Sequence, residues 1–261
     1  MTDAPLSRHD LYERCVQSPR QLAPLLAAIH GENPRTLGED FAGTAALSIQ
    51  WARPDDRAAI AADLDPVALA HHPDHPRVTR RHADVLETHD PCDLLFAGNF
   101  SIGYLRTRAE LLAYLRHARA RLNPGGAFVC DIYGGETAFL TGEVERDHPI
   151  TDGPHAGAHV RYTWAQREAD PITGMVTNTC SFRVERDGAA VQEMPDAFVY
   201  RWRLWSVPEL RDAMAEAGFG STEVYDHHPD AVDDEGLAYA EPVTDPDDLD
   251  DSFIVLIAAR R

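Results

Sequence analysis

Hydrophobic and polar positions alternate in two different ways along this chain. Up to about residue 142, short apolar runs are separated by runs with apolar residues at helical spacing. Such short runs are typical of strands that are buried on both faces of a sheet. Strands are predicted over residues 36–40, 58–62, 77–82, 93–97 and 127–133, and helices over 11–29, 44–51 and 105–122, with a further helix start at residues 65–66. This alternation predicts a parallel, doubly wound α/β sheet.

The pattern changes to an alternation of period two between about residues 143 and 205. Runs over 159–168, 175–185 and 198–205 have the pattern of strands, and the turn residues at 170–174 join the first two runs as a hairpin. We therefore expect an antiparallel insertion here. A helix starting at Val207 and two strands, at 221–225 and 253–258, then complete the chain, with an acidic loop over 230–251 between these strands.

The composition excludes several classes of function. A formal net charge of -19 argues against a nucleic-acid partner, because neutralising phosphates requires clustered cations. The chain contains no lysine, which excludes a P-loop lysine and Schiff-base chemistry. The four cysteines are scattered without a Cys-x-x-Cys pair, which favours a reducing, cytoplasmic location. The absence of a long apolar run and the polar first ten residues predict neither a membrane span nor a signal peptide.

Candidate chemistry is concentrated where the predicted strands end. The segment Leu-Gly-Glu-Asp-Phe-Ala-Gly-Thr-Ala-Ala-Leu at 37–47 places an acidic, glycine-containing turn before a helix, and Asp63 ends the next strand. Such a turn lets the backbone approach a ligand, the helix N-terminus faces that ligand, and a carboxylate can accept from two ribose hydroxyls. Asp65 competes for the ribose role, but its place before Pro66 suits helix capping. The pattern predicts a nucleoside site.

Four features, in this order, resemble the motifs of class I S-adenosylmethionine (SAM) dependent methyltransferases. They are the turn at 39–45, Asp63, the sequence Ala-Asp-Val at 83–85 and the sequence Leu-Asn-Pro-Gly-Gly at 122–126. Phe41 and Ala45 stand where the family usually has its first and third glycines. The resemblance covers nearly the whole chain. It implies a Rossmann-like doubly wound α/β sheet, mostly parallel with an antiparallel last strand, in a single methyltransferase domain of residues 1–261.

The sequence Asn-Phe-Ser-Ile-Gly-Tyr-Leu at 99–105 and the β-rich insertion resemble the small-molecule N-methyltransferases, which include amino-sugar enzymes and glycine N-methyltransferase. This resemblance implies a substrate lid at 143–205 and an N-terminal helical cover at 1–35. It places Tyr12 near the sulfonium of the cofactor. Tyr104 stands where amino-sugar enzymes tend to have histidine. Tyr12 and Tyr104 are thus the predicted catalytic residues that flank the methyl group.

The resemblance also assigns residues to the cofactor SAM. Asp63 would bind the ribose, Asp84 the adenine amino group, and Glu39 the methionine ammonium directly or through water. Asp84 could instead cap a turn, and Glu39 could form a surface salt bridge. Asn99 follows the fourth strand and points toward the crevice where ligands of such sheets bind. The full predicted cofactor set is Tyr12, Glu39, Ala42, Gly43, Thr44, Asp63, Leu64, Asp84, Val85 and Asn99.

Aromatic residues of the insertion are the main candidates for binding the acceptor. Alternation places Tyr162 and Trp164 on one face, where they could surround a cationic amine or form sheet core. Arg203 shares the opposite face of its strand with Arg201, and could bind an anionic group or pair with a carboxylate. The predicted substrate set is Tyr133, Tyr162, Trp164, Tyr200 and Arg203.

No metal site is predicted. The sequence His-His-Pro-Asp-His at 71–75 has ligand-type residues, but its prolines favour a surface turn.

The predicted activity is SAM-dependent methyl transfer to nitrogen or oxygen of a small polar molecule by in-line displacement, with nitrogen slightly preferred. The partner expected is a small-molecule acceptor, with no nucleic acid and no membrane, and a homodimer is left open. Two alternatives remain. One is a non-catalytic SAM-binding or scaffold protein on the same fold, which the replaced glycines favour. The other is an NAD-type oxidoreductase, whose G-x-G-x-x-G turn is missing from this chain.

Overall fold

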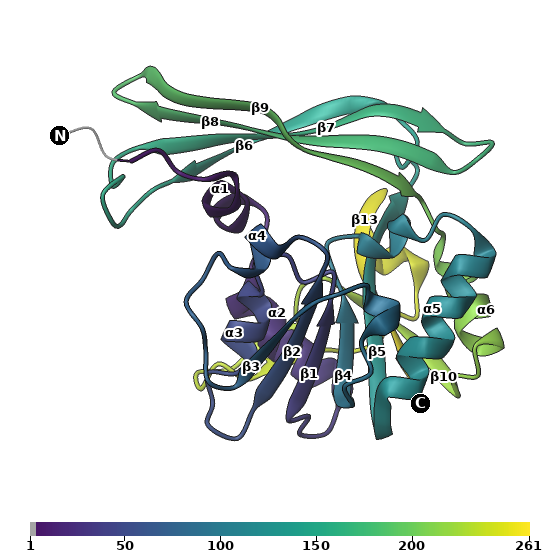
Figure 1. Ribbon diagram of the computed structural model, residues 1–261. Coiled ribbons are helices and arrows are strands. Elements are labelled where there is room, and N and C mark those ends of the chain that lie inside the picture. Colours follow the sequence, from purple (N-terminus) through teal and green to yellow (C-terminus); the bar gives the residue numbers. More distant parts are fainter. Residues whose placement is uncertain (1–3) are drawn as a thin grey trace. The chain divides into compact units, whose positions relative to one another are not determined.

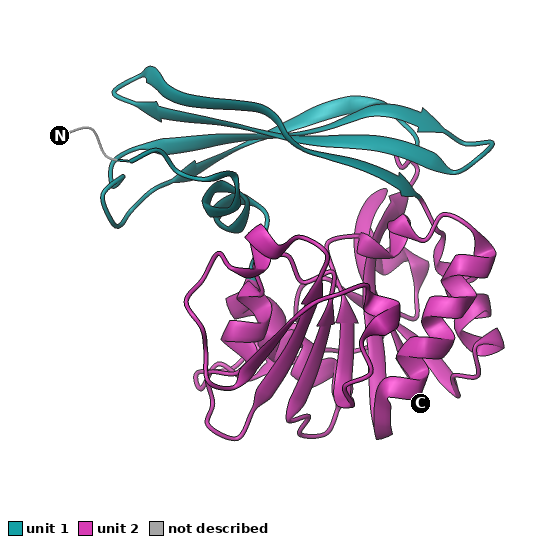
Figure 2. Ribbon diagram, viewed as in Figure 1, with its two compact units in different colours: residues 1–18, 139–203 teal, residues 19–138, 204–261 magenta. Residues whose placement is uncertain are grey.

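The computed structural model describes residues 4–261 and divides into two compact units (Figure 2). Unit 1 joins the described part of Met1–Ser18 to Phe139–Arg203. Unit 2 joins Pro19–Ala138 to Leu204–Arg261. The N-terminal helix and the insertion therefore belong to one unit, and the α/β sheet belongs to the other.

Unit 2 is built on a seven-stranded sheet with the strand order β10-β13-β5-β4-β1-β2-β3. Its strands are β1 (Thr36–Asp40), β2 (Ala58–Asp63), β3 (Val78–His82), β4 (Cys92–Ala97), β5 (Leu122–Gly135), β10 (Ser221–Asp226) and β13 (Ser252–Arg260). Strand β13 is antiparallel to both of its neighbours, whereas the pairs from β5 to β3 are parallel. The predicted sheet, mostly parallel with an antiparallel last strand, is confirmed.

Helices cover both faces of this sheet, as Figure 1 shows. The helical segments of unit 2 are α2 (Pro19–His30), α3 (Ala46–Trp51), α4 (Pro66–Leu69), α5 (Arg108–Arg121), α6 (Val207–Glu216) and the short 3-10 turns η1 (Val85–Glu87), η2 (Ser101–Tyr104) and η3 (Pro246–Asp248). Leu94 and Phe96 pack with α2 and α3, whereas Leu95 and Ala97 pack with α5 and α6. The apolar run of β4 thus serves two cores, which is why it lacks alternation. None of the helices within residues 4–261 is long and apolar enough to cross a membrane.

The starts of two elements differ from the prediction. Helix α5 begins at Arg108 rather than at 105, because Thr107 caps it: its hydroxyl accepts from the Glu110 N–H (3.2 Å), and Glu110 accepts from the Thr107 N–H (2.8 Å). Strand β5 begins at Leu122 rather than after Gly126, with a shift in its pairing with β4 along this stretch. The loop predicted over 230–251 contains a small hairpin of β11 (Ala231–Val232) and β12 (Ala238–Tyr239).

Unit 1 consists of helix α1 (Arg8–Cys15) and a four-stranded antiparallel sheet. Its strands follow one another in the order β6 (Gly142–Pro149), β7 (His159–Asp170), β8 (Met175–Arg186) and β9 (Ala189–Arg203). The sequence did not predict β6, because most of this strand is exposed and Val144 is its only large apolar residue. Strand β9 begins well before Phe198; its first half is mostly exposed and has no regular alternation of apolar and polar residues, so it gave no strand signal.

Candidate active site

The turn after β1 holds three residues in the left-handed region of backbone conformation. Phe41, Gly43 and Ala45 have φ angles of 57°, 54° and 60°. Glycine adopts this conformation freely, but a residue with a side chain adopts it at a cost of about 1 kcal/mol or more. Phe41 and Ala45 are the two positions where the resemblance expects glycine. The chain therefore has a left-handed backbone at two positions where the resemblance expects glycine, on either side of the retained Gly43.

Asp63 ties this turn to the end of the neighbouring strand. Its Oδ2 accepts from the Gly43 N–H (2.7 Å), and its Oδ1 accepts from the Asp65 N–H (2.8 Å). A carboxylate has about four acceptor positions, so two remain for further donors. Asp65 itself caps α4, accepting from the N–H groups of Val67 (2.9 Å) and Ala68 (3.2 Å), as the sequence predicts. Of the two carboxylates, Asp63 is the one that contacts the turn after β1, whereas Asp65 contacts the first turn of α4.

Glu39 lies near the end of β1 and is only 6 % exposed, which excludes a surface salt bridge. Its Oε2 accepts from the Ser48 N–H (2.9 Å) and the Ser48 hydroxyl (2.5 Å). Burial raises the pKa of Glu39 to about 7, against the lowering effect of these hydrogen bonds. The second oxygen, Oε1, is left to accept from a ligand.

The neighbouring Asp40 is fully buried and serves a different purpose. Both of its oxygens lie 2.9 Å from Nη1 of Arg121, and Oδ2 also accepts from the Tyr114 hydroxyl (2.9 Å). Arg121 and Tyr114 come from α5, so this group fastens the end of β1 to that helix. The sequence did not predict this cluster, because Tyr114 and Arg121 lie 74 and 81 residues after Asp40.

The segments after β2 and β3 carry the residues predicted for adenine. Asp84 caps η1, because its Oδ1 accepts from the Leu86 N–H (2.9 Å). The alternative that Asp84 caps a turn is therefore correct for one of its two oxygens. Val85 is buried, whereas Leu64 is 65 % exposed. Leu64 immediately follows Asp63, so an exposed apolar side chain lies beside the carboxylate predicted for ribose. Such a pairing of apolar and carboxylate groups suits a nucleoside.

A second left-handed turn follows β4. Asn99 and Phe100 have φ angles of 53° and 60°. Asp131 of β5 accepts from both of their backbone N–H groups, with Oδ2 2.9 Å from Asn99 and Oδ1 2.7 Å from Phe100. Burial raises the pKa of Asp131 to about 6. Sequence analysis missed Asp131, whose only signal is a carboxylate within a buried strand.

Aromatic rings link these two turns to the residues predicted for catalysis and substrate binding. Tyr104, at the end of η2, is 42 % exposed and stacks on Phe41 with ring centroids 6.1 Å apart. The ring of Phe100 meets Tyr133 of β5 edge-on at 5.0 Å. Ala42 and Thr44, both predicted to contact the cofactor, are buried within the first turn. Apart from Tyr12, the predicted cofactor residues all belong to unit 2 and lie at or beyond the carboxyl ends of β1 to β4.

The remaining predicted residues belong to unit 1, and two of them, Trp164 and Tyr200, form an aromatic face on its sheet together with Trp202. Trp164 stacks on Tyr200 at 6.3 Å, and Tyr200 stacks on Trp202 at 4.4 Å. Both Trp164 and Tyr200 are partly exposed, as ligand-binding residues must be. Tyr162, in contrast, is buried with its hydroxyl 3.6 Å from Cys180 Sγ, which makes it core.

Helix α1 packs on this aromatic face of unit 1. Leu11 and Cys15 are buried in the same core, and the centroid of the Tyr12 ring lies 4.9 Å from that of Phe198.

Arg203, predicted to contact the substrate, is the last residue of β9 and pairs with Met175 of β8. Since Tyr12 is in unit 1 and Tyr104 in unit 2, their joint placement at a methyl group stays a prediction.

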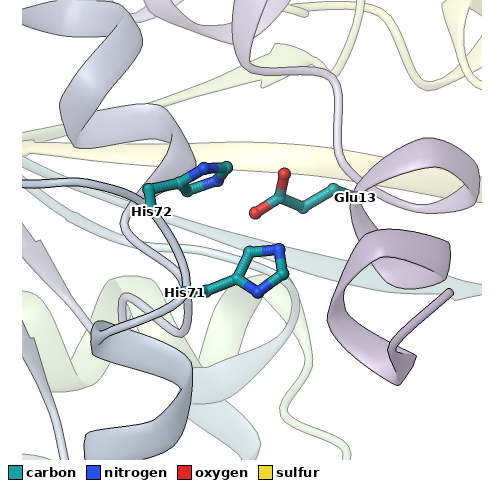
Figure 3. A group of neighbouring side chains, drawn as sticks. All are labelled: Glu13, His71 and His72. Carbon is teal, nitrogen blue, oxygen red and sulfur yellow. The ribbon is translucent and has the colours of Figure 1, made fainter. Parts of the chain in front are cut away.

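His71 and His72 lie in the partly exposed turn after α4 (Figure 3), where the sequence predicts a surface turn. Their rings meet at nearly a right angle, with centroids 4.9 Å apart. Glu13, drawn with them, belongs to α1 of unit 1. Within unit 2 the pair therefore places two imidazole rings side by side in this turn.

Comparison with known proteins gives a result for structure only. No family model matches the chain, and no curated protein matches it significantly. Many solved structures do match. DesVI from Streptomyces venezuelae is 17% identical with a TM-score of 0.69, over 95% of this chain and 94% of that one.

Two other solved structures illustrate the same likeness. SAM-bound CalS10, an amino pentose methyltransferase from Micromonospora echinaspora, is 17% identical over 100% of both chains, with a TM-score of 0.67. The sugar N-methyltransferase KedS8 from a Streptoalloteichus species is 18% identical over 100% of this chain and 95% of that one, with a TM-score of 0.64. The chain has the Rossmann-like fold of these methyltransferases.

Proposed function

We propose that this chain is an enzyme that binds SAM at the carboxyl edge of the unit 2 sheet and transfers its methyl group to a small polar acceptor. The observation that carries the proposal is the contact of Asp63 with the Gly43 N–H, which joins a ribose-type carboxylate to a left-handed turn. The fold shared with SAM-bound CalS10 supports SAM as the nucleoside.

The residues at this edge fit the parts of SAM. Asp63 has acceptor capacity for the two ribose hydroxyls, and exposed Leu64 offers an apolar contact to the base. Asp84 has an oxygen for the adenine amino group beyond the one that caps η1. Glu39 has Oε1 for the methionine ammonium, and a bound cation would favour its ionised form. Each carboxylate is oriented in advance by a backbone N–H, which lowers the entropy lost on binding.

SAM supplies a methyl group that its sulfonium has already activated for in-line displacement. The chain then needs to align the acceptor, keep water out and, for a hydroxyl acceptor, remove a proton. We assign Tyr104 to alignment of the acceptor; its exposed ring, stacked on Phe41 of the turn that would hold the cofactor, supports this role. We assign Tyr12 the same role from unit 1.

The acceptor that we propose is methylated at nitrogen or oxygen, with nitrogen preferred. A neutral amine needs no strong base but needs alignment, which Tyr12 and Tyr104 could provide without a further catalytic group. The amino pentose and sugar N-methyltransferases of the same fold also favour nitrogen. Partly exposed Trp164 and Tyr200 would contact the acceptor, with residues 143–205 as its lid and 1–35 as an N-terminal cover.

Calorimetric titration with SAM and with S-adenosylhomocysteine tests the cofactor part. We expect micromolar binding by the wild type, loss of binding in Asp63→Ala and retention in Asp65→Ala. The control, Asp65→Ala, removes a carboxylate two residues away that caps α4 and is not proposed to bind ribose. No binding of either compound by the wild type, or equal binding by both variants, would overturn the proposal.

Radiolabelled SAM incubated with panels of amines, amino sugars, phenols and carboxylic acids tests the transfer part. Methylated product from an amine or hydroxyl panel supports an enzyme. Tight cofactor binding without product from any panel would instead indicate a non-catalytic SAM-binding protein.

A further inference from the structure

Asp131 holds the turn between β4 and η2 in an uncommon backbone conformation. Asn99 and Phe100 are consecutive residues with positive φ, and two such residues direct their N–H groups toward one point. The carboxylate of Asp131 occupies that point, with one oxygen for each N–H (2.9 and 2.7 Å). Without an acceptor there, both the left-handed backbone and the two donors would lose their compensation.

The same contact orients the peptide at which η2 begins. Phe100 is the N-cap residue of this turn and makes no side-chain capping hydrogen bond. Its carbonyl accepts from the Gly103 N–H (2.9 Å), so the orientation of the Phe100 peptide sets where η2 begins. Asp131 is 31 residues away in sequence and fixes that orientation from the neighbouring strand.

The turn delivers two residues to the proposed site. Asn99, at its start, is a predicted cofactor contact, and Tyr104, at the end of η2, stacks on Phe41 of the first turn (6.1 Å). The Phe100 ring meets Tyr133, which lies two residues beyond Asp131 on the same strand. The Asp131 carboxylate thus connects β5 to the turn after β4, and the Tyr104–Phe41 contact connects that turn to the one after β1.

We propose that Asp131 is a positioning residue for methyl transfer, which acts by holding Asn99 and Phe100 so that Tyr104 is kept against Phe41. This inference rests on the proposed function. Asp131 binds no ligand in this role. Its removal disorders the turn that aligns the acceptor, while Asp63 and Glu39 still hold the cofactor.

A matched control exists at the other end of β4. Oδ2 of Asp93 accepts from the successive N–H groups of Arg35 and Thr36, both at 2.9 Å, and its Oδ1 accepts from Asn123. Asp93→Asn therefore neutralises a carboxylate that also accepts from two successive backbone N–H groups, but at the amino edge of the sheet, away from the proposed site.

The test compares Asp131→Asn with Asp93→Asn. The amide of asparagine keeps one acceptor and turns a donor toward the second N–H. We expect hydrogen exchange across residues 98–104 to become about tenfold faster in Asp131→Asn and to stay unchanged in Asp93→Asn. With the best acceptor from the panels, kcat should fall about tenfold or more in Asp131→Asn, while the Kd for S-adenosylhomocysteine rises less than about fivefold.

Equal exchange and equal kcat in the two variants would overturn the proposal, as would a loss of cofactor affinity as large as the loss of kcat. Asp131→Glu, which keeps the charge but displaces the oxygens by one methylene, carries the test if Asp131→Asn does not fold. It should show the same local rise in exchange. If the wild type binds no SAM, the proposed function fails, whereas the exchange measurement still decides whether Asp131 holds the turn.

Discussion

The ring of Phe41 stacks on the ring of Tyr104, with centroids 6.1 Å apart and planes inclined by 28°. Phe41 occupies a left-handed position in the turn after β1, and Tyr104 ends the short helical turn after β4. The residue that replaces an expected glycine therefore contributes a contact that glycine cannot make. The strained backbone at Phe41 is offset, at least in part, by aromatic packing.

Substitutions of Phe41 separate these two contributions. Phe41→Ala and Phe41→Gly both remove the ring, but only alanine keeps a Cβ at φ 57°. We expect Phe41→Ala to have the lower free energy of unfolding, by about 1 kcal/mol, because of the left-handed conformation. Urea unfolding followed by circular dichroism measures this difference. An alanine variant as stable as the glycine variant would show that position 41 carries no backbone strain.

Glu39 should make the stability of the protein depend on pH. Its pKa is about 7 in the folded chain and near 4.5 in the unfolded chain, so the folded state binds the extra proton between these values. The free energy of unfolding should therefore fall by about 3 kcal/mol as the pH rises through this window. Glu39→Gln removes the titration, so its stability relative to the wild type should be greater at about pH 8 than at about pH 5.

Thermal melts at the two pH values measure this effect. Glu145→Gln, on exposed β6, is the control and should shift the melting temperature alike at both. A Glu39→Gln variant with the same pH profile as the wild type would contradict the raised pKa.

The buried pair of Asp40 and Arg121 should be indispensable for stability. Asp40→Asn leaves the Arg121 guanidinium buried without its carboxylate, and we expect a loss of about 3–5 kcal/mol in the free energy of unfolding. The control is Asp74→Asn, which breaks an ion pair with Arg80 (3.1 Å) whose carboxylate is fully exposed. That variant should unfold with nearly the wild-type midpoint, because solvent screens exposed pairs. Similar losses in both variants would show that the Asp40 pair is not special.

Salt should stabilise the chain through its acidic segment. Residues 226–251 contain eleven aspartates and glutamates and no arginine, within a chain of net charge -19. Raising KCl from about 0.05 M to about 1 M screens their repulsion and should raise the melting temperature. Changing Asp234, Asp247, Asp248 and Asp250 together to asparagine should make that rise smaller. The slope of melting temperature against salt is the measurement, and an unchanged slope would place the repulsion elsewhere.

Most of the strands and helices of unit 2, and the order of its candidate carboxylates, can be read from the sequence alone. Apolar runs are set by burial on both faces of a sheet, and this local signal predicted the positions of β1, β2 and β4 within a residue or two. The capping role of Asp65 was equally readable, because a cap acts on the next few residues of its own chain. Strand β6 was not predicted, because an exposed polar strand has no run of apolar residues.

Only the tertiary structure decided which of these groups meet. Asp40 finds Arg121, and Asp131 finds Asn99 and Phe100, across 81, 32 and 31 residues of sequence. Such pairs depend on the order and register of strands in the sheet, which periodicity within a single element does not encode. The left-handed backbone at Phe41 could not be predicted from the sequence either, because phenylalanine does not favour this conformation. The contacts around the turn impose it. Local patterns therefore predicted the positions of the candidate carboxylates along the chain, and packing between distant segments decided which partners bind them.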